Sequence, residues 1–256
     1  MESYSEIANL LRKANNVLFI TGAGVSADSG LPTYRGVGGL YEDQSTEDGI
    51  PIEEALSGRM LLSRPEISWK YIWEIGAACQ KASHNRAHEV IAAIEAMKPE
   101  SWVLTQNVDG FHRTAGSKNL IEIHGHIFDL FCVRCAYRVD TRTFFSASAS
   151  PPDLPPKCPQ CQGLIRPDVV LFEELLPEKE VQKLDQVLDS EIDMIFSIGT
   201  TAVFPYIIQP VLMARKSGKP TVEINPALTD LSNLVDYHLK TGAAEAMDRL
   251  WKMLQN

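Results

Sequence analysis

Short apolar runs that alternate with helical patterns limit this chain to one class of fold. The runs are VLFIT (17–21), SWVLTQN (101–107), DMIFSIGTT (193–201) and PTVEIN (220–225). Strands that alternate with helices form a parallel sheet with helices on both faces. We therefore predict an α/β fold, a doubly wound, Rossmann-like parallel sheet. The helices are expected at 3–15, 52–83, 86–98, 178–190, 206–217 and 242–254, with short extended pieces at 120–125, 169–172 and 236–239.

Small and polar residues follow the strands at the edge where such a sheet binds ligands. In open parallel sheets, ligands lie outside the carboxyl ends of the strands. Candidate contacts occur at four of these ends, namely Gly22–Ser26, Thr105–Asp109, Gly199–Thr201 and Asn225. The first of them opens a glycine-rich turn and a short helix, a context in which backbone N–H groups hold phosphate. We expect a nucleotide site along this edge.

The glycine-rich turn GAGVSADSG (22–30) departs from the fingerprint of hydride-transfer enzymes. Ala27 occupies the third glycine position, which that fingerprint allows, but an acid is also required about 20 residues further on. Gln44 lies there instead, inside a long loop over 31–51 that is typical of a binding lid. A hydride-transfer unit is disfavoured, and a tight structural turn remains an alternative.

Four of the five cysteines form two CxxC pairs, Cys132 with Cys135 and Cys158 with Cys161. Each CxxC turn presents two thiolates, and four thiolates complete a tetrahedral zinc site that has no open position. The pairs predict one structural Zn²⁺ per chain, although a redox dithiol or unconnected cysteines would also fit. The fifth cysteine, Cys79, is expected to be a buried thiol.

Three polar residues have both a structural and a chemical interpretation. His124 follows alternating apolar residues, and a lone histidine on a strand is often a satisfied structural residue, although it also moves protons near neutral pH. Asn107 and Asp109 follow a strand, where they either bind a polar ligand or hydrogen-bond their own turn. Their residue types alone leave both interpretations open.

The composition excludes several classes of partner. A net charge of -9 argues against non-specific binding to nucleic acid or anionic membranes. No apolar run reaches the length of a membrane span, and the N-terminus lacks a secretory pattern. We expect a cytoplasmic protein with no direct nucleic-acid or membrane partner.

Several longer motifs together resemble the sirtuin family of NAD-dependent protein deacylases, over about residues 7–250. Singly each is weak, but their common order is specific. They are GAGVSADSGLPTYRG (22–36), TQNVDGFHRTAG (105–116), IEIHG (121–125), the two cysteine pairs, VVLFEELLP (169–177), GTTAVFP (199–205) and EIN (223–225).

The resemblance implies a role for most of the strand-end residues. The implied catalytic residues are His124 and Asn107. The implied contacts of the co-substrate NAD are Gly22, Ala23, Gly24, Ser26, Ala27, Tyr34, Arg35, Gln106, Asn107, Asp109, Gly199, Thr200, Thr201, Asn225 and Ala243. The implied contacts of an acyl-lysine protein or peptide are His124, Val169, Phe172, Glu173 and Val203. The peptide would add as a strand between residues 169–173 and the segment after Thr201.

The resemblance also implies the chemistry. The acyl oxygen attacks C1′ of the nicotinamide ribose and expels nicotinamide. Neutral His124 then takes a proton from a ribose hydroxyl, and the products are free lysine, nicotinamide and 2′-O-acyl-ADP-ribose. NAD is consumed, and zinc takes no chemical part.

The resemblance further implies a division of the chain into parts. The ranges 1–51, 84–125 and 169–256 would form the Rossmann-like NAD-binding domain. Residues 52–83 would form the helical part of a small domain or lid, and 126–168 a zinc-ribbon insert.

The chain departs from the family pattern at Tyr34 and Glu173, and from the pattern of desuccinylase-type members at Ala78 and Lys81. Tyr34 replaces a phenylalanine and keeps the ring. Glu173 replaces a glycine, and its carboxylate either favours basic peptides or points to solvent. Desuccinylase-type members carry a tyrosine and an arginine where this chain has Ala78 and Lys81, so we expect an acetyl or longer apolar acyl group rather than succinyl.

Two alternatives to deacylation remain. Mono-ADP-ribosyl transfer to protein would use the same C1′ electrophile. A catalytically silent module that binds NAD or acyl-lysine is disfavoured, because no group that the chemistry needs is missing. The sequence does not indicate the oligomeric state or the physiological substrates.

Overall fold

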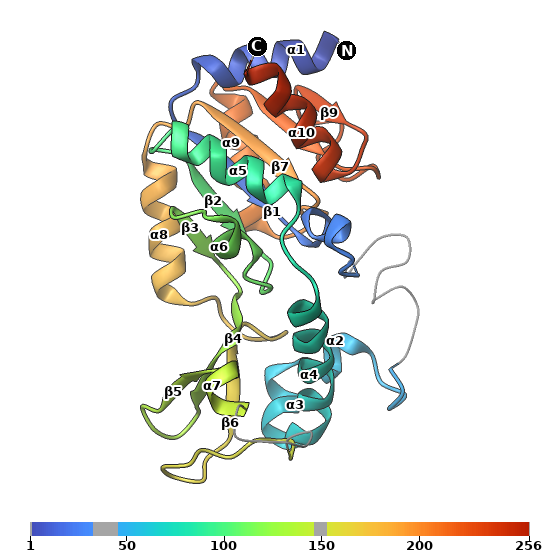
Figure 1. Cartoon of the computed structure of the whole chain (residues 1–256), viewed down its shortest axis with the longest axis vertical. Coiled ribbons are helices and arrows are strands. Elements are labelled where there is room, and N and C mark those ends of the chain that lie inside the picture. Colours follow the sequence, from blue (N-terminus) through green and yellow to red (C-terminus); the bar gives the residue numbers. More distant parts are fainter. Residues whose placement is uncertain (1, 33–45, 146–152, 256) are drawn as a thin grey trace.

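The computed structural model describes residues 2–32, 46–145 and 153–255, which contain a large and a small sheet (Figure 1). The large sheet has the order β3-β2-β1-β7-β8-β9, and all its pairings are parallel. This confirms the predicted parallel α/β fold. The strands are β1 (Val17–Thr21), β2 (Trp102–Thr105), β3 (Leu120–Glu122), β7 (Met194–Ile198), β8 (Thr221–Ile224) and β9 (Tyr237–Leu239).

Helices cover both faces of this sheet, because its central strands are apolar on both sides. Phe19 of β1 belongs to a core shared with α1 (Glu2–Lys13), α5 (Arg86–Met97) and α10 (Ala243–Leu254). Its neighbour Leu18 points to the opposite face, where α8 (Glu178–Asp189) and α9 (Pro205–Lys216) pack. Successive side chains of a strand alternate between faces, so one buried strand supports two helical layers.

The small sheet is antiparallel and lies at the far end of the molecule from α1 and α10 (Figure 1). It consists of β4 (Gly125–Cys132), β5 (Arg138–Asp140) and β6 (Ile165–Val169), and α7 (Thr141–Phe145) follows β5. Its core is shared with helices α2 (Ile52–Ala55), α3 (Gly58–Ser63) and α4 (Pro65–Lys81). The buried indole of Trp69 donates a hydrogen bond to the carbonyl of Ile165 over 2.9 Å, which ties α4 to β6.

Three local expectations need correction. The range 52–83 contains three helices, because Ser57 caps α3 by accepting from the N–H of Met60, and Pro65 begins α4. The helix expected after the glycine-rich turn is two 3₁₀ turns, Ala23–Val25 and Ala27–Ser29, and Gly30 ends the second with φ of 83°.

The run at 169–172 does not return to the large sheet. Val169 ends β6 and pairs with Gly125 in the small sheet. Phe172 then donates its N–H to the carbonyl of Leu56 and accepts from the N–H of Gly58. Leu171 is buried in the core of the small sheet and its helices. An apolar run of this kind can be buried in the core of either sheet. Here it packs against α2 and α3 and is buried in the core of the small sheet.

Glu173 has φ of 69°, a conformation that glycine adopts freely and that other residues adopt at a cost. Its carboxylate lies 3.8 Å from Arg59, and because both side chains are exposed this pair adds little stability. We expect Glu173→Gly to raise the free energy of unfolding by about 1 kcal/mol, through relief of backbone strain. Urea denaturation of the zinc-loaded protein measures this.

Glu173→Ala is the matched control, because it removes the same carboxylate and keeps the Cβ atom. It should leave the stability nearly unchanged. Equal stabilisation by alanine and glycine would show that the carboxylate, and not the backbone conformation, carries the cost.

Candidate active site

The glycine-rich turn packs closely against the turn that follows β7. Gly22 donates its N–H to the carbonyl of Ile198 over 3.1 Å, and Gly24 donates to Gly199 over 2.8 Å. A Cβ atom on Gly24 would lie 2.6 Å from the Cα of Gly199, so no other residue fits there. The two turns therefore form one rigid backbone surface at the carboxyl ends of β1 and β7.

Two distant residues hold the outer part of this turn. Asn85, the N-cap of α5, donates its amide to the carbonyl of Val25 and to the hydroxyl of Ser29 over 2.8 and 2.9 Å. Asp28 accepts from the N–H of Ala244 over 2.9 Å, which places the start of α10 beside the turn. Ala243, the first residue of α10, is buried there, and Ala27 lies in the second 3₁₀ turn.

Asn107, Asp109 and Ser26 form a buried polar network. The hydroxyl of Ser26 donates to Asp109 Oδ2 over 2.7 Å, and the amide of Asn107 donates to Ser26 Oγ and to the carbonyl of Gly22, both over 3.1 Å. Asp109 Oδ1 accepts from the N–H of Phe111 over 2.9 Å. Burial raises the pKa of the Asp109 carboxyl, against these hydrogen bonds. The network fixes both side chains, so they offer a ligand a preorganised set of polar atoms.

A pocket opens beside this network, and one wall of it comes from α4. Cys79 is buried in this wall, and burial together with the nearby Asp109 raises the pKa of its thiol to about 12. The expectation of a buried thiol is confirmed, and its place on a pocket wall was not predicted. The pocket is lined by Ala23, Ser26, Leu31, Pro32, Ile75, Ala78, Cys79, Asn107, Val108 and Asp109.

His124 lies between β3 and β4, with both ring nitrogens in hydrogen-bond contact. Nδ1 is 2.9 Å from the carbonyl oxygen of Gln106, and Nε2 is 2.7 Å from the hydroxyl of Tyr206. A carbonyl only accepts, so Nδ1 carries the proton and Nε2 holds the lone pair of the neutral ring. Burial lowers the pKa of His124, which keeps the ring neutral at physiological pH. An unprotonated ring nitrogen is suited to general-base work.

Gln106, Thr200 and Asn225 are brought together from three strand ends. Gln106 donates its amide to Thr200 Oγ1 over 2.8 Å, and Asn225 donates its amide to the carbonyl of Thr200 over 3.2 Å. Thr200 and Asn225 are buried, and Thr201 is the next, half-buried residue. These residues continue the polar edge from the glycine-rich turn.

The segment expected to contact a substrate peptide lies next to His124. Val170 donates its N–H to the carbonyl of His124 over 2.9 Å. Val203, which follows β7, is 46% exposed. Of the peptide contacts expected there, Phe172 already has both backbone groups paired with residues 56–58. Tyr34 and Arg35 lie outside the described residues.

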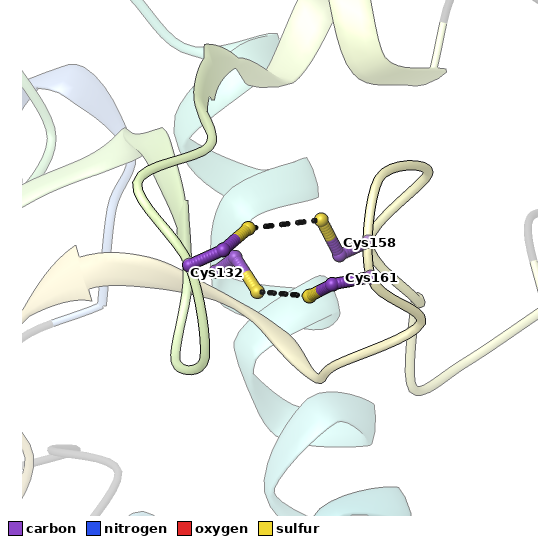
Figure 2. Close-up of side chains that lie close together, drawn as sticks. Cys132, Cys158 and Cys161 are labelled. Carbon is purple, nitrogen blue, oxygen red and sulfur yellow. Dashed lines mark hydrogen bonds between the residues drawn. The ribbon is translucent and has the colours of Figure 1, made fainter.

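The four cysteines of the two pairs converge at one point of the small lobe, which is the small sheet β5-β4-β6 together with helices α2, α3 and α4; Figure 2 labels three of them, Cys132, Cys158 and Cys161. Their sulfur atoms all lie within 4.8 Å of one another, with 3.5 Å between Cys132 and Cys161 and 3.7 Å between Cys135 and Cys158. Sulfurs that are about 2.3 Å from one tetrahedral zinc are separated by roughly 3.8 Å, while a disulfide would need about 2.05 Å. The predicted Cys₄ arrangement is confirmed, and the four residues fit a structural zinc.

Tyr206 and Phe204 are site residues that the sequence did not indicate. Their rings stack at 5.4 Å and 10°, and each meets the ring of His124 edge-on. Phe204 lies inside the motif GTTAVFP (199–205) and Tyr206 follows it, but the sequence predicted only NAD contacts at 199–201 and a peptide contact at Val203.

The chain matches the model of a known protein family and two relatives of high sequence identity. The model of the Sir2 family matches residues 22–205. The NAD-dependent protein deacylase 2 of Pseudomonas syringae pv. tomato is 54% identical over 247 residues, which cover 96% of this chain and 98% of that protein. The protein of the same name from Pseudomonas aeruginosa is 49% identical, and 98% of each chain is covered.

Solved structures of Sir2 homologues have the same fold as this chain. A Sir2 homologue in complex with NAD superposes with a TM-score of 0.84 at 32% identity, covering 98% of this chain and 93% of that one. A mutant Sir2 homologue in complex with 2′-O-acetyl ADP ribose superposes with a TM-score of 0.85 at 32% identity, covering 98% of this chain and 96% of that one.

Within the described residues, no helix has the length and apolar character that crossing a membrane requires.

Proposed function

Because this chain belongs to the Sir2 family and is an NAD-dependent protein deacylase, we propose which of its residues carry out each part of the reaction. The observation that carries the proposal is the unprotonated Nε2 of His124, held at the same sheet edge as the network of Asn107 and Asp109. A base and a largely apolar pocket with one polar wall, on the same edge, suit a reaction that expels a neutral amide and then moves one proton.

Asn107 and Asp109 receive the nicotinamide amide. Both are buried and fixed by Ser26, so their remaining hydrogen-bonding capacity faces the pocket walled by Ala78 and Cys79. Binding the carboxamide in a set geometry orients the ribose bond that is broken. Preorganised polar atoms of this kind lower the barrier without reorganising during the reaction.

The backbone surface of the glycine-rich turn and the edge beyond it hold the rest of NAD. Gly22, Ala23, Gly24, Ser26 and Ala27 form the turn. Gln106, Gly199, Thr200, Thr201 and Asn225 continue the edge toward Ala243. Tyr34 and Arg35 complete the set as predicted from the sequence motif. The N–H groups of Gly22 and Gly24 already donate to Ile198 and Gly199, so these glycines contribute close backbone approach. Side-chain amides such as those of Gln106 and Asn225 carry two N–H donors each and suit ribose and phosphate oxygens.

His124 acts as the general base on a ribose hydroxyl. Its Nδ1–H is held by Gln106, so Nε2 faces the reacting atoms with its lone pair. The peptide lies along residues 169–173 and Val203, where Val169 and Glu173 flank it. Phe172 contributes its side chain rather than its backbone, since that backbone is already paired. Free lysine, nicotinamide and 2′-O-acyl-ADP-ribose leave the enzyme.

Zinc bound by Cys132, Cys135, Cys158 and Cys161 would hold the turns of the small lobe together, and four thiolates leave no position for a substrate. We propose domain boundaries that follow the sequence division with one change. The ranges 1–51, 84–125 and 173–256 form the NAD-binding domain, 52–83 the helical part of the small domain or lid, and 126–168 the zinc-bearing insert. Residues 169–172 go with the insert, because they pack against α2 and α3.

Labelled NAD distinguishes deacylation from the alternatives. We expect NAD labelled in its adenine, incubated with the enzyme and an acetyl-lysine peptide, to yield label on a small acylated sugar. Label on protein would instead support ADP-ribosyl transfer. A melting shift with NAD but no turnover would support a silent binding module.

A panel of peptides tests the acyl preference. Ala78 lines the pocket with a methyl group and Lys81 is exposed, so neither offers the tyrosine contact of desuccinylases. We propose that acetyl and longer apolar acyl groups are removed faster than succinyl. Mass spectrometry of the panel measures the rates, and a succinyl peptide turned over fastest would contradict the proposal.

A further inference from the structure

Tyr206 is the one side chain among the described residues that contacts the base nitrogen of His124. The two residues are 82 positions apart, on α9 and between β3 and β4, and their polar atoms are 2.7 Å apart. The phenol ring is held by stacking on Phe204. The geometry is thus built by two aromatic side chains and is not a chance surface contact.

The direction of the hydrogen bond between Tyr206 and His124 follows from the partner of the other ring nitrogen, Nδ1. Gln106 presents a carbonyl oxygen to Nδ1, so Nδ1 donates and Nε2 of the neutral ring accepts. Tyr206 must therefore be the donor. Burial raises the pKa of Tyr206 to about 12, so its hydroxyl keeps its proton at any working pH.

The ionisable groups on neighbouring elements have partners of their own. Glu122 before the ring pairs with Arg113, and His126 after it lies 3.3 Å from Asp129. Glu173 on the adjacent segment faces Arg59, and Asp109 accepts from Ser26. Tyr206 is thus the titratable side chain in direct contact with the ring of His124 in the described structure.

We propose that Tyr206 is a positioning residue of the deacylation reaction. Its hydroxyl donates to Nε2 of His124 in the resting enzyme and keeps that nitrogen unprotonated, and the ribose hydroxyl of NAD takes its place as donor when the co-substrate binds. The exchange is of one O–H donor for another, and Tyr206 retains its own proton. This inference rests on the proposed function of His124 as the base.

The first test follows His124 without any turnover. Imidazole resonances of protein labelled with ¹⁵N-histidine are titrated in the absence of NAD, and His124→Ala assigns the signal. The hydrogen bond exists only with the neutral ring, so Tyr206→Phe should raise the titration midpoint of His124 by about 0.5–1 pH unit. Tyr237→Phe, at the far edge of the large sheet, should leave the midpoint unchanged. An unchanged midpoint in Tyr206→Phe would overturn the proposal.

The second test is kinetic. Tyr206→Phe keeps the ring that stacks on Phe204, so its melting temperature should match that of the wild type. On the acid limb of the pH profile, kcat/KM should fall about three- to tenfold below the wild type, and on the neutral plateau the two should agree within about twofold. An equal loss at every pH would mean a structural role and would overturn the proposal. If the chain had no deacylase activity, the NMR result would still report on the contact, so the two failures are distinguishable.

Discussion

His124→Ala is expected to lower the rate of acyl removal by about 10²- to 10⁴-fold at neutral pH, the range that a positioned general base contributes. Alanine removes both ring nitrogens, and with them the proton acceptor that Gln106 and Tyr206 orient. The fixed network of Asn107 and Asp109 is untouched, so NAD should still bind. Release of 2′-O-acyl-ADP-ribose from an acetyl-lysine peptide, followed by mass spectrometry, measures the loss.

His84→Ala is the matched control for this change. His84 precedes α5 and its Nδ1 lies 3.2 Å from Thr114 Oγ1, away from the base and its partners. It should keep activity within about twofold and melt at the same temperature. Similar losses in both variants would contradict the assignment of His124 as the base.

The pH profile of the wild-type enzyme gives an independent check on the same residue. Burial lowers the pKa of His124 below its usual 6.5, and the base works only in its neutral form. Activity should therefore be full above that pKa and should fall as the pH drops through it. We expect the acid limb of kcat/KM below pH 6.5, and a limb centred above 7 would contradict a buried neutral base.

Cys158→Ser is expected to remove zinc and to unfold the small lobe. Cys158 is fully buried in the core that β4, β6 and α4 share, so the loss of one thiolate affects both the metal site and its surroundings. Structural zinc contributes apparent folding free energies on the order of 10 kcal/mol in small domains. Even a loss of about 4 kcal/mol would lower the melting temperature by roughly 10 °C. Zinc content by mass spectrometry and thermal unfolding measure the two effects.

Cys79→Ser is the control that distinguishes loss of zinc from the effect of replacing any buried cysteine. Cys79 is buried in α4 outside the cluster, so this variant should retain one zinc per chain. In the wild type, a strong chelator should reproduce the effect of Cys158→Ser, with exposure of Trp69 and loss of solubility. Equal folding with and without the chelator would contradict a structural metal.

The sequence alone determined the large sheet, the strand-end edge and the zinc cluster. These features depend on short-range patterns. Apolar runs such as 17–21 indicate buried strands, glycines at 22 and 24 permit close backbone approach, and each CxxC turn brings its own two thiolates together. The order of the sirtuin motifs added the family, which the comparisons confirmed.

Only the tertiary structure decided the contacts between residues that no local pattern links. Tyr206 reaches His124 because α9 packs on β7 and β8, on the sheet face that β3 also covers, and nothing near position 206 in the sequence indicates that partner. Cys79 lines the ligand pocket because α4 lies against the strand edge, and residues 169–172 join the small lobe because α2 and α3 bury them. Periodicity and turn chemistry act over a few residues, whereas the environment of a side chain is set by whichever distant segments pack around it.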